Sequence, residues 1–192
     1  MKHFSAVFPA LFFSMMMSLL LLSCSREAEP GTELSSEALR LEQIAVAENR
    51  FRTLMLENPD SPEFRPQARF LAEEYRMFAY RYPEHSMAPE MLFLAANLFA
   101  DALDEPGQAV ALFRQLAQEW PDTPQAERSL FLAGYTYHHL LGEPDNAREM
   151  YARLIEAFPE SDLREAAQDD MALIGTDPME LLRNFQQAEG EN

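Results

Sequence analysis

An internal repeat with a fixed offset of 38 residues constrains this chain more than any other feature. Residues 82–119 align with residues 120–157 without a gap. Identical aligned pairs include Pro83/Pro121, Ala88/Ala126, Phe93/Phe131, Leu94/Leu132, Ala95/Ala133, Leu103/Leu141, Glu105/Glu143, Pro106/Pro144, Ala109/Ala147 and Leu116/Leu154. Repeats of this length are supersecondary units that bury their apolar faces only by stacking on their neighbours. The repeat therefore predicts a solenoid that binds or scaffolds rather than an enzyme.

Each repeat has the pattern of two helices. The first helices are expected at residues 86–103 and 124–141, and the second helices at residues 106–119 and 144–157. The turns between them are too short for anything except an antiparallel helical hairpin. Each second helix begins at a proline, where a missing N–H costs little.

Degenerate helix pairs flank these two units. Upstream, a helix that begins at Ser35 or Ser36 is followed by a second helix that begins near Pro66. Downstream, the last unit is truncated, as expected of a capping unit whose outer face meets water. The sequence thus predicts an all-α fold, a short α-solenoid at residues 35–188, with pairs at about 35–81, 86–119, 124–157 and 162–187 and a frayed tail at 189–192.

The N-terminus has the layout of an exported chain. The basic start at Lys2 precedes an apolar stretch over residues 4–22, which is typical of a secretory signal peptide. The stretch ends in Leu21-Leu22-Ser23-Cys24, which resembles a bacterial lipobox. That resemblance implies that Cys24 is acylated and becomes the mature N-terminus.

We therefore expect a lipoprotein signal peptide at residues 1–23, lipid attachment to the membrane at Cys24 and a flexible tether at residues 24–34. The alternative is an uncleaved membrane anchor. Pro9 and three serines make the apolar stretch a poor spanning helix, which needs about 20 strongly apolar residues. In both cases the chain is exported and tethered.

Charge and cysteine content exclude several functions. Lys2 is the only lysine, and the formal net charge is −17. Nucleic-acid binding requires a basic footprint, and so does adsorption to anionic lipid, so we expect neither from the folded part. Cys24 is the only cysteine. Its acylation would leave no thiol for a disulfide, a zinc site or a nucleophile.

The two clear units resemble tetratricopeptide repeats. In that family a small residue in the first helix is followed three residues later by an aromatic one. An alanine in the second helix is followed four residues later by another aromatic residue, and a proline closes the unit. The matching residues are Ala96, Phe99, Ala109, Phe113 and Pro121 in one unit and Gly134, Tyr137, Ala147, Tyr151 and Pro159 in the next. The resemblance implies protein binding by first helices that line an inner groove.

The repeat period exceeds the family's usual length of about 34 residues. One extra residue falls in the turn inside the hairpin, and three fall between the closing proline and the next small residue. This spacing is similar to that of the repeat lipoprotein of the β-barrel assembly machinery and of division-coordinating periplasmic repeat proteins. The resemblance implies a protein of the bacterial cell envelope at the periplasmic face of the outer membrane; the inner membrane and the cell surface stay open.

The sequence contains no recognisable catalytic or metal-binding motif. His138 and His139 are adjacent, and adjacent residues on an α-helix point about 100° apart, so they rarely share an ion. Asp169 and Asp170 are likewise adjacent, which is typical of a solvated face. No glycine-rich phosphate loop or nucleophile elbow is present. We therefore expect no enzyme activity, no cofactor, no metal site and no small-molecule substrate.

The first helices supply the candidate groove residues. Arginine and tyrosine commonly dominate interface energies, and both occur on the expected groove side. The alternative at each position is an ordinary solvated helix face. The candidates are Asn97 and Asp101 from one unit and Arg128, Tyr135, His138 and His139 from the next.

Two functions remain open at this point. The first is a lipid-anchored envelope scaffold that binds a protein or peptide partner in its groove. The second is a permanent, non-enzymatic accessory subunit of an outer-membrane assembly complex. A permanent subunit should expose a large apolar patch, whereas a peptide dock should show a polar groove with few aromatic anchors.

Overall fold

The computed structural model describes residues 35–176. The expected signal peptide, the lipid attachment at Cys24 and the tether lie outside the described residues. So do the helix expected near residues 179–187 and the frayed tail. Within residues 35–176 every regular element is helical, so the predicted all-α class is confirmed.

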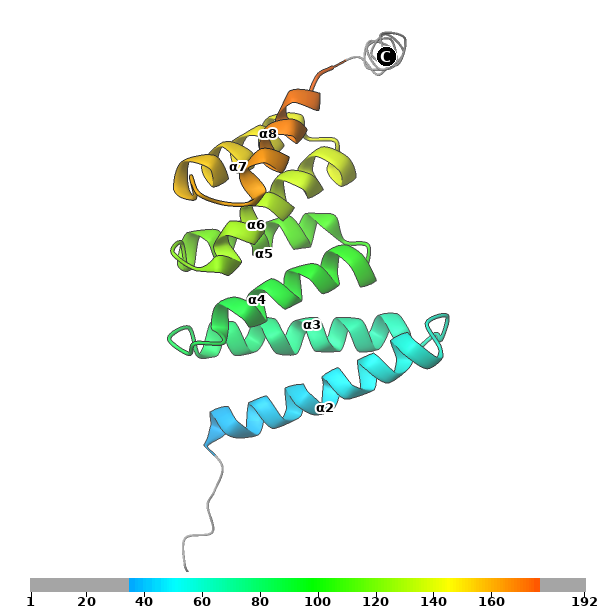
Figure 1. Cartoon of the computed structure of the whole chain (residues 1–192). Helices are drawn as coiled ribbons and strands as arrows, with labels where there is room; N and C mark the ends of the chain where they lie inside the picture. The colour runs from blue at the N-terminus through cyan, green and yellow to red at the C-terminus, as the bar shows by residue number, and fades with distance from the viewer. Residues whose placement is uncertain (1–34, 177–192) are drawn as a thin grey trace, which may run out of the picture. The chain divides into compact units, whose positions relative to one another are not determined.

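The described part of the chain is a stack of antiparallel helix pairs (Figure 1). The pairs are α2/α3, α4/α5 and α6/α7, and α8 is the first helix of a further unit. The α-helices are α2 (Ser36–Glu57), α3 (Phe64–Arg81), α4 (Ala88–Asn97), α5 (Pro106–Glu119), α6 (Pro124–Tyr135), α7 (Pro144–Ala157) and α8 (Leu163–Leu173). Two π-helical segments, η1 (Leu98–Ala102) and η2 (Thr136–Leu141), continue α4 and α6.

The helices on the inner side of the stack pack more closely together than those on the outer side. Each helix contacts the helices before and after it in the chain, and the first helix α6 also contacts the first helices α4 and α8 directly. The second helices α3, α5 and α7 are spaced further apart, so the first helices line the inner side of the stack. Among the described helices, α2 departs from this rule because it does not pack against α4.

The core is built from the small and aromatic residues of the repeat. Ala96, Ala109 and Ala147 are fully buried, and they let neighbouring helices approach closely. Tyr151 is also fully buried, and a Cβ placed on Gly134 would overlap its ring. The small residue is therefore required at this crossing, because close-packed interiors have no room for an added methyl group.

The aromatic-proline junctions repeat in their backbone conformation as well as in sequence. Tyr82, Trp120 and Phe158 end α3, α5 and α7 with φ of −129°, −129° and −127°. In each case the backbone N–H donates to the carbonyl four residues earlier, at 2.8–2.9 Å. The Trp120 Nε1–H also donates to the carbonyl of Pro83 at 3.1 Å, which ties consecutive junctions together.

The π-helical segments hold the extra residue of each hairpin. The Leu103 N–H donates to the Leu98 carbonyl at 3.0 Å, five residues back, and the Gly142 N–H donates to Tyr137 with the same separation. A π turn contains one residue more than an α turn, so it absorbs an insertion without losing the hydrogen-bond ladder. The expectation that this residue lies in the turn is therefore wrong.

The turn after each π segment has a left-handed residue, and this yields a stability prediction. Asp104 has φ of 55° and the equivalent Gly142 has φ of 66°. Left-handed backbone costs an L-residue about 1–2 kcal/mol, although aspartate tolerates it better than most. We expect Gly142→Ala to lower the free energy of unfolding by about 1 kcal/mol. We expect Asp104→Gly to raise it by up to about 1 kcal/mol.

Urea unfolding of the two variants would measure these changes. No atom lies within 4 Å of a Cβ placed on Gly142, so the expected cost is conformational strain and not a clash. A destabilised Asp104→Gly variant, or an unchanged Gly142→Ala variant, would contradict this description of the turn.

Within residues 35–176, none of the helices has the length and the apolar character that crossing a bilayer requires.

Candidate partner-binding groove

A hollow of about 400 Å³ opens on the inner side of the stack, between α2 and the continuous helix α4–η1. It exists because α2 does not pack against α4, so α3 forms its floor. Its walls are mostly apolar and include Phe51 and Met55 from α2 and Leu94 and Leu98 from α4–η1. Met55 is 47 % exposed, so this wall is open to solvent.

Two of the predicted groove residues line this hollow. Asn97 and Asp101 lie four residues apart along α4–η1, so their side chains share one face of the helix. Within the described part of the chain neither side chain forms a hydrogen bond or an ion pair. The hollow therefore combines apolar walls with one amide and one carboxylate. That combination suits a partner segment with apolar anchors and polar main-chain groups.

Arg128 and Tyr135 lie further along the inner side of the stack. The Arg128 guanidinium lies 4.2 Å from the centroid of the Phe93 ring, so it links α6 to α4 through a cation–π contact. The Tyr135 ring is exposed and lies 4.5 Å from the ring of His139. Neither residue lines the hollow that contains Asn97 and Asp101. Asn97 and Asp101 therefore line the hollow, Tyr135 lies beside His139 in a second place, and Arg128 lies apart from both.

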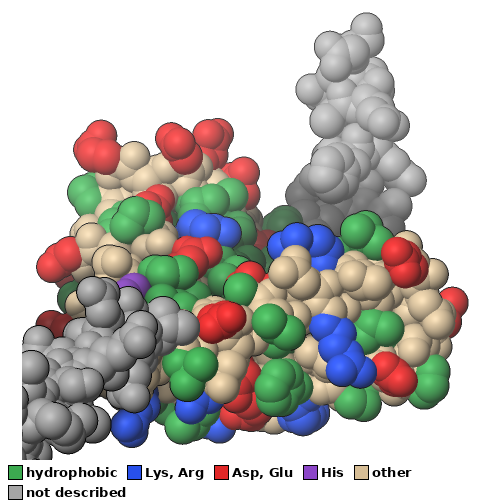
Figure 2. All heavy atoms as spheres, turned by 90° about the horizontal axis from the view of Figure 1, so that it is seen from below, with side chains coloured by type: hydrophobic (Ala, Val, Ile, Leu, Met, Phe, Trp, Pro, Cys, Tyr) green, Lys and Arg blue, Asp and Glu red, His purple; other side chains and the backbone are tan. Residues whose placement is uncertain are grey.

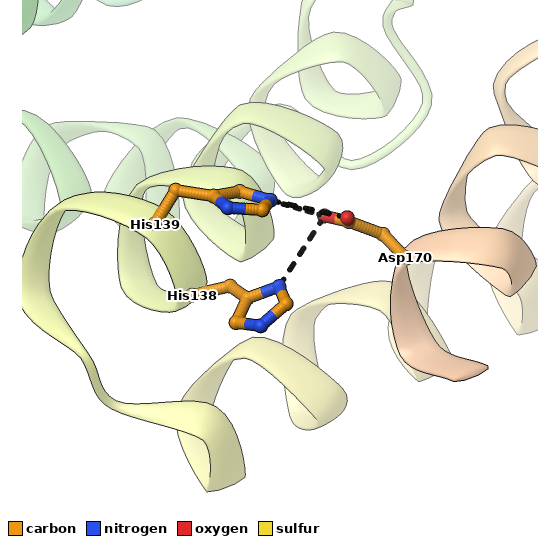
Figure 3. Close-up of side chains that lie close together, drawn as sticks. All are labelled: His138, His139 and Asp170. Atoms are coloured by element: carbon orange, nitrogen blue, oxygen red, sulfur yellow. Dashed lines mark hydrogen bonds and ion pairs between the residues drawn. The ribbon is translucent and has the colours of Figure 1, made fainter. Parts of the chain in front are cut away.

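The second place is a cluster at the C-terminal end of the inner side. His138 and His139 extend from η2 toward Asp170 on α8 (Figure 3). The His139 Nε2 lies 3.1 Å from Asp170 Oδ1, and the His138 Nδ1 lies 3.7 Å from Asp170 Oδ2. The hydroxyl of the buried Tyr151 on α7 donates a hydrogen bond to Asp170 Oδ2.

Sequence reasoning missed Asp170. Its side chain is only 15 % exposed, so the expectation of a solvated face is wrong for this residue. Asp170 lies one 38-residue offset after Leu132, which in turn follows Leu94 by the same offset. The two preceding units have leucine at this position. The carboxylate in the third unit is therefore the signal from which Asp170 could have been identified. The assumption of α-helical geometry at His138 and His139 was also wrong, because η2 is π-helical.

The cluster perturbs the ionisation of both Asp170 and Tyr151. Burial by itself would raise the pKa of the Asp170 carboxyl, but hydrogen bonds from Tyr151 and His139 and the nearby imidazoles hold that pKa below its usual value. Burial raises the pKa of the Tyr151 phenol, and its hydrogen bond to Asp170 raises it further. Asp170 is therefore a carboxylate at neutral pH, and Tyr151 is its hydrogen-bond donor.

The sequence profile of the tetratricopeptide repeat family matches residues 90–123 and 128–161. These two units are similar to tetratricopeptide repeats. The matches begin 38 residues apart, which is the offset of the internal repeat, and they cover most of the α4–α7 segment. Tetratricopeptide repeats commonly mediate protein–protein interactions. No curated protein matches the chain.

Proposed function

We propose that this protein is a lipid-anchored scaffold of the bacterial cell envelope that binds a segment of a partner protein in the inner groove of its repeats. The observation that supports this function most strongly is the hollow between α2 and α4–η1. Its apolar walls would bury anchor side chains of the partner, and Asn97 and Asp101 would bond to its polar groups. The tetratricopeptide repeats themselves support a protein partner.

The lipid anchor rests on the N-terminal sequence. Residues 4–22 are apolar, and the lipobox-like ending at Cys24 supports acylation of that cysteine. The short polar stretch after Cys24 would tether the repeats to the bilayer. We place the protein at the periplasmic face of the outer membrane, and we propose no catalytic activity, because tetratricopeptide repeats are generally interaction modules.

A second function, a permanent accessory subunit of an outer-membrane assembly complex, is favoured by a different surface. The outer face of α2 and α3 exposes Leu39, Val46 and Phe70, around a depression of about 650 Å³. The outer face of a terminal repeat is normally polar, so these apolar side chains suit a permanent neighbour. Figure 2, viewed from the α2 end, shows hydrophobic side chains separated by acidic and basic ones on this side. We therefore rank this function second.

Two substitutions on one helix separate the two functions. Met55 on α2 lines the inner hollow, and Val46 on α2, which is 66 % exposed, lies on the outer face. We expect Met55→Glu to weaken partner binding by about thirtyfold, because a buried charge replaces an apolar anchor worth about 2 kcal/mol. Val46→Glu should bind as well as the unmodified chain. Crosslinking and affinity measurements on envelope extracts would compare them.

Circular dichroism melting of both variants provides the folding control, since both side chains are substantially exposed. If Val46→Glu abolishes the interaction and Met55→Glu retains it, the partner uses the outer face of α2 and α3. The accessory-subunit function would then replace the groove function.

A further inference from the structure

The groups that surround Asp170 have the composition of a metal site. Three residues, His138, His139 and Asp170, each offer one ligand atom, and these three atoms lie within 4.8 Å of one another. Zinc binds imidazole nitrogen and carboxylate oxygen at about 2.0–2.2 Å, so its ligands must converge on one point. Figure 3 shows that the two imidazoles and the carboxylate face the same space. His139 has the most exposed side chain of the three, at 37 %, so it is the ligand with most freedom to move toward a shared ion.

His138 and His139 both lie in the π-helical segment η2. The two adjacent rings are tilted by 38°, with their centroids 4.2 Å apart. Short π-helical segments inside helices occur frequently at functional sites, where they redirect side chains.

The His138 Nδ1 is the independent sign of a ligand. This nitrogen is buried and has no hydrogen-bond partner among the residues that the structure describes. Buried polar atoms are nearly always paired, so an unpaired one calls for an explanation such as an ion. The Asp170 carboxylate lies 3.7 Å away, too far for a hydrogen bond. An ordinary ion pair between His139 and Asp170 would leave this nitrogen unexplained.

Tyr151 supplies the outer support of the carboxylate. Its hydroxyl donates to Asp170 Oδ2, and its ring is held by complete burial against Gly134. Outer hydrogen bonds of this kind orient metal ligands and usually change metal affinity by 10- to 100-fold when they are removed.

We propose that His138, His139 and Asp170 bind a divalent transition-metal ion, with zinc as the expected ion. Two imidazoles and one carboxylate suit zinc, nickel, cobalt or copper, whereas magnesium and calcium prefer sites made only of oxygen ligands. Three protein ligands leave a fourth position for water or for a group of a bound partner. This site does not depend on the proposed function, since its ligands all belong to this chain.

The test is titration of the purified full chain in detergent with Zn²⁺ by calorimetry and with Co²⁺ by visible absorption. We expect one ion per chain and a cobalt spectrum typical of nitrogen and oxygen ligands. The double variant His138→Ala, His139→Ala should lose more than about 100-fold in zinc affinity, since even an outer-shell change costs 10- to 100-fold. Tyr151→Phe should lose about tenfold.

His85→Ala is the matched control. His85 also faces a carboxylate, with its Nε2 at 3.1 Å from Glu37 Oε1, but it is not part of the cluster. Its replacement should leave zinc affinity unchanged. Circular dichroism without metal would show that all variants fold. The proposal is overturned if the unmodified chain binds neither ion, or if the double variant binds zinc as tightly as the unmodified chain.

Discussion

Replacing Tyr151 with alanine should lower the free energy of unfolding by about 3–5 kcal/mol, the usual cost of removing a large buried aromatic side chain. The Tyr151 ring is fully buried, and its centroid lies 5.8 Å from that of Phe131. Its hydroxyl bonds to Asp170, so the same change also removes a link between α7 and α8. Chemical denaturation monitored by circular dichroism would measure the loss. Phe113→Ala, one repeat earlier, is the matched comparison and should cost a similar amount.

Gly134 packs against the Tyr151 ring where α6 and α7 cross, so enlarging it should also destabilise the fold. Gly134→Ala adds only one methyl group, but that group would overlap the Tyr151 ring, so we expect a loss of roughly 1–3 kcal/mol. Gly107→Ala is its control, because no atom lies within 4 Å of a Cβ placed there. If Tyr151→Ala and Gly134→Ala both unfold at the same denaturant concentration as the unmodified chain, the packing described here is incorrect.

Replacing Cys24 with serine should abolish lipid attachment completely. A serine offers no thiol for acylation, and Cys24 is the only cysteine in the chain. A single acyl chain gives only marginal membrane binding, so stable anchoring needs several chains, which all depend on this residue. Labelling with a radioactive or clickable fatty acid, followed by membrane fractionation, would measure the change.

The matched control for that experiment is Ser25→Ala, which keeps the cysteine and alters the next residue. It should still incorporate lipid and fractionate with membranes. A Cys24→Ser variant that incorporates label and matures at the normal level would rule out the lipoprotein assignment and favour the uncleaved anchor.

The helix pairs could be predicted from the sequence because their signals are local. Prolines mark the starts of second helices, and the junctions Tyr82-Pro83, Trp120-Pro121 and Phe158-Pro159 mark their ends. Each of these signals depends only on backbone geometry within a few residues. The structure has helical boundaries at the same places, with α5 and α7 beginning at Pro106 and Pro144.

The candidate site could be predicted only in part, because its geometry depends on contacts between repeats. The inner-side location of Asn97 and Asp101 follows from the family resemblance. The hollow that they line depends on the separation of α2 from α4, which no local pattern indicates. Asp170 meets His138 and His139 across the interface of two first helices, a contact between residues 31 or 32 positions apart that no local pattern indicates. An inserted residue is visible in the repeat length, but the sequence does not show whether it enters the turn or the helix.

No local sequence pattern predicts which apolar residues of α2 are exposed. Val46 and Ala47 are neighbours in an apolar stretch, yet Ala47 is buried and Val46 is exposed. Helical periodicity predicts which residues share a face, but α2 carries apolar residues on more than one face. Which face meets α3 is settled by packing with the rest of the stack.

The most direct test of the central claim is site-specific photocrosslinking in cells of the source organism. A photoreactive amino acid would be placed at Asn97 on the inner side and, as a control, at the exposed Gln118 on the outer helix α5. If the repeats bind a partner segment in the inner groove, Asn97 should give a discrete adduct with one envelope protein, and Gln118 should not. An adduct with that protein from Gln118 and none from Asn97 would contradict the groove function.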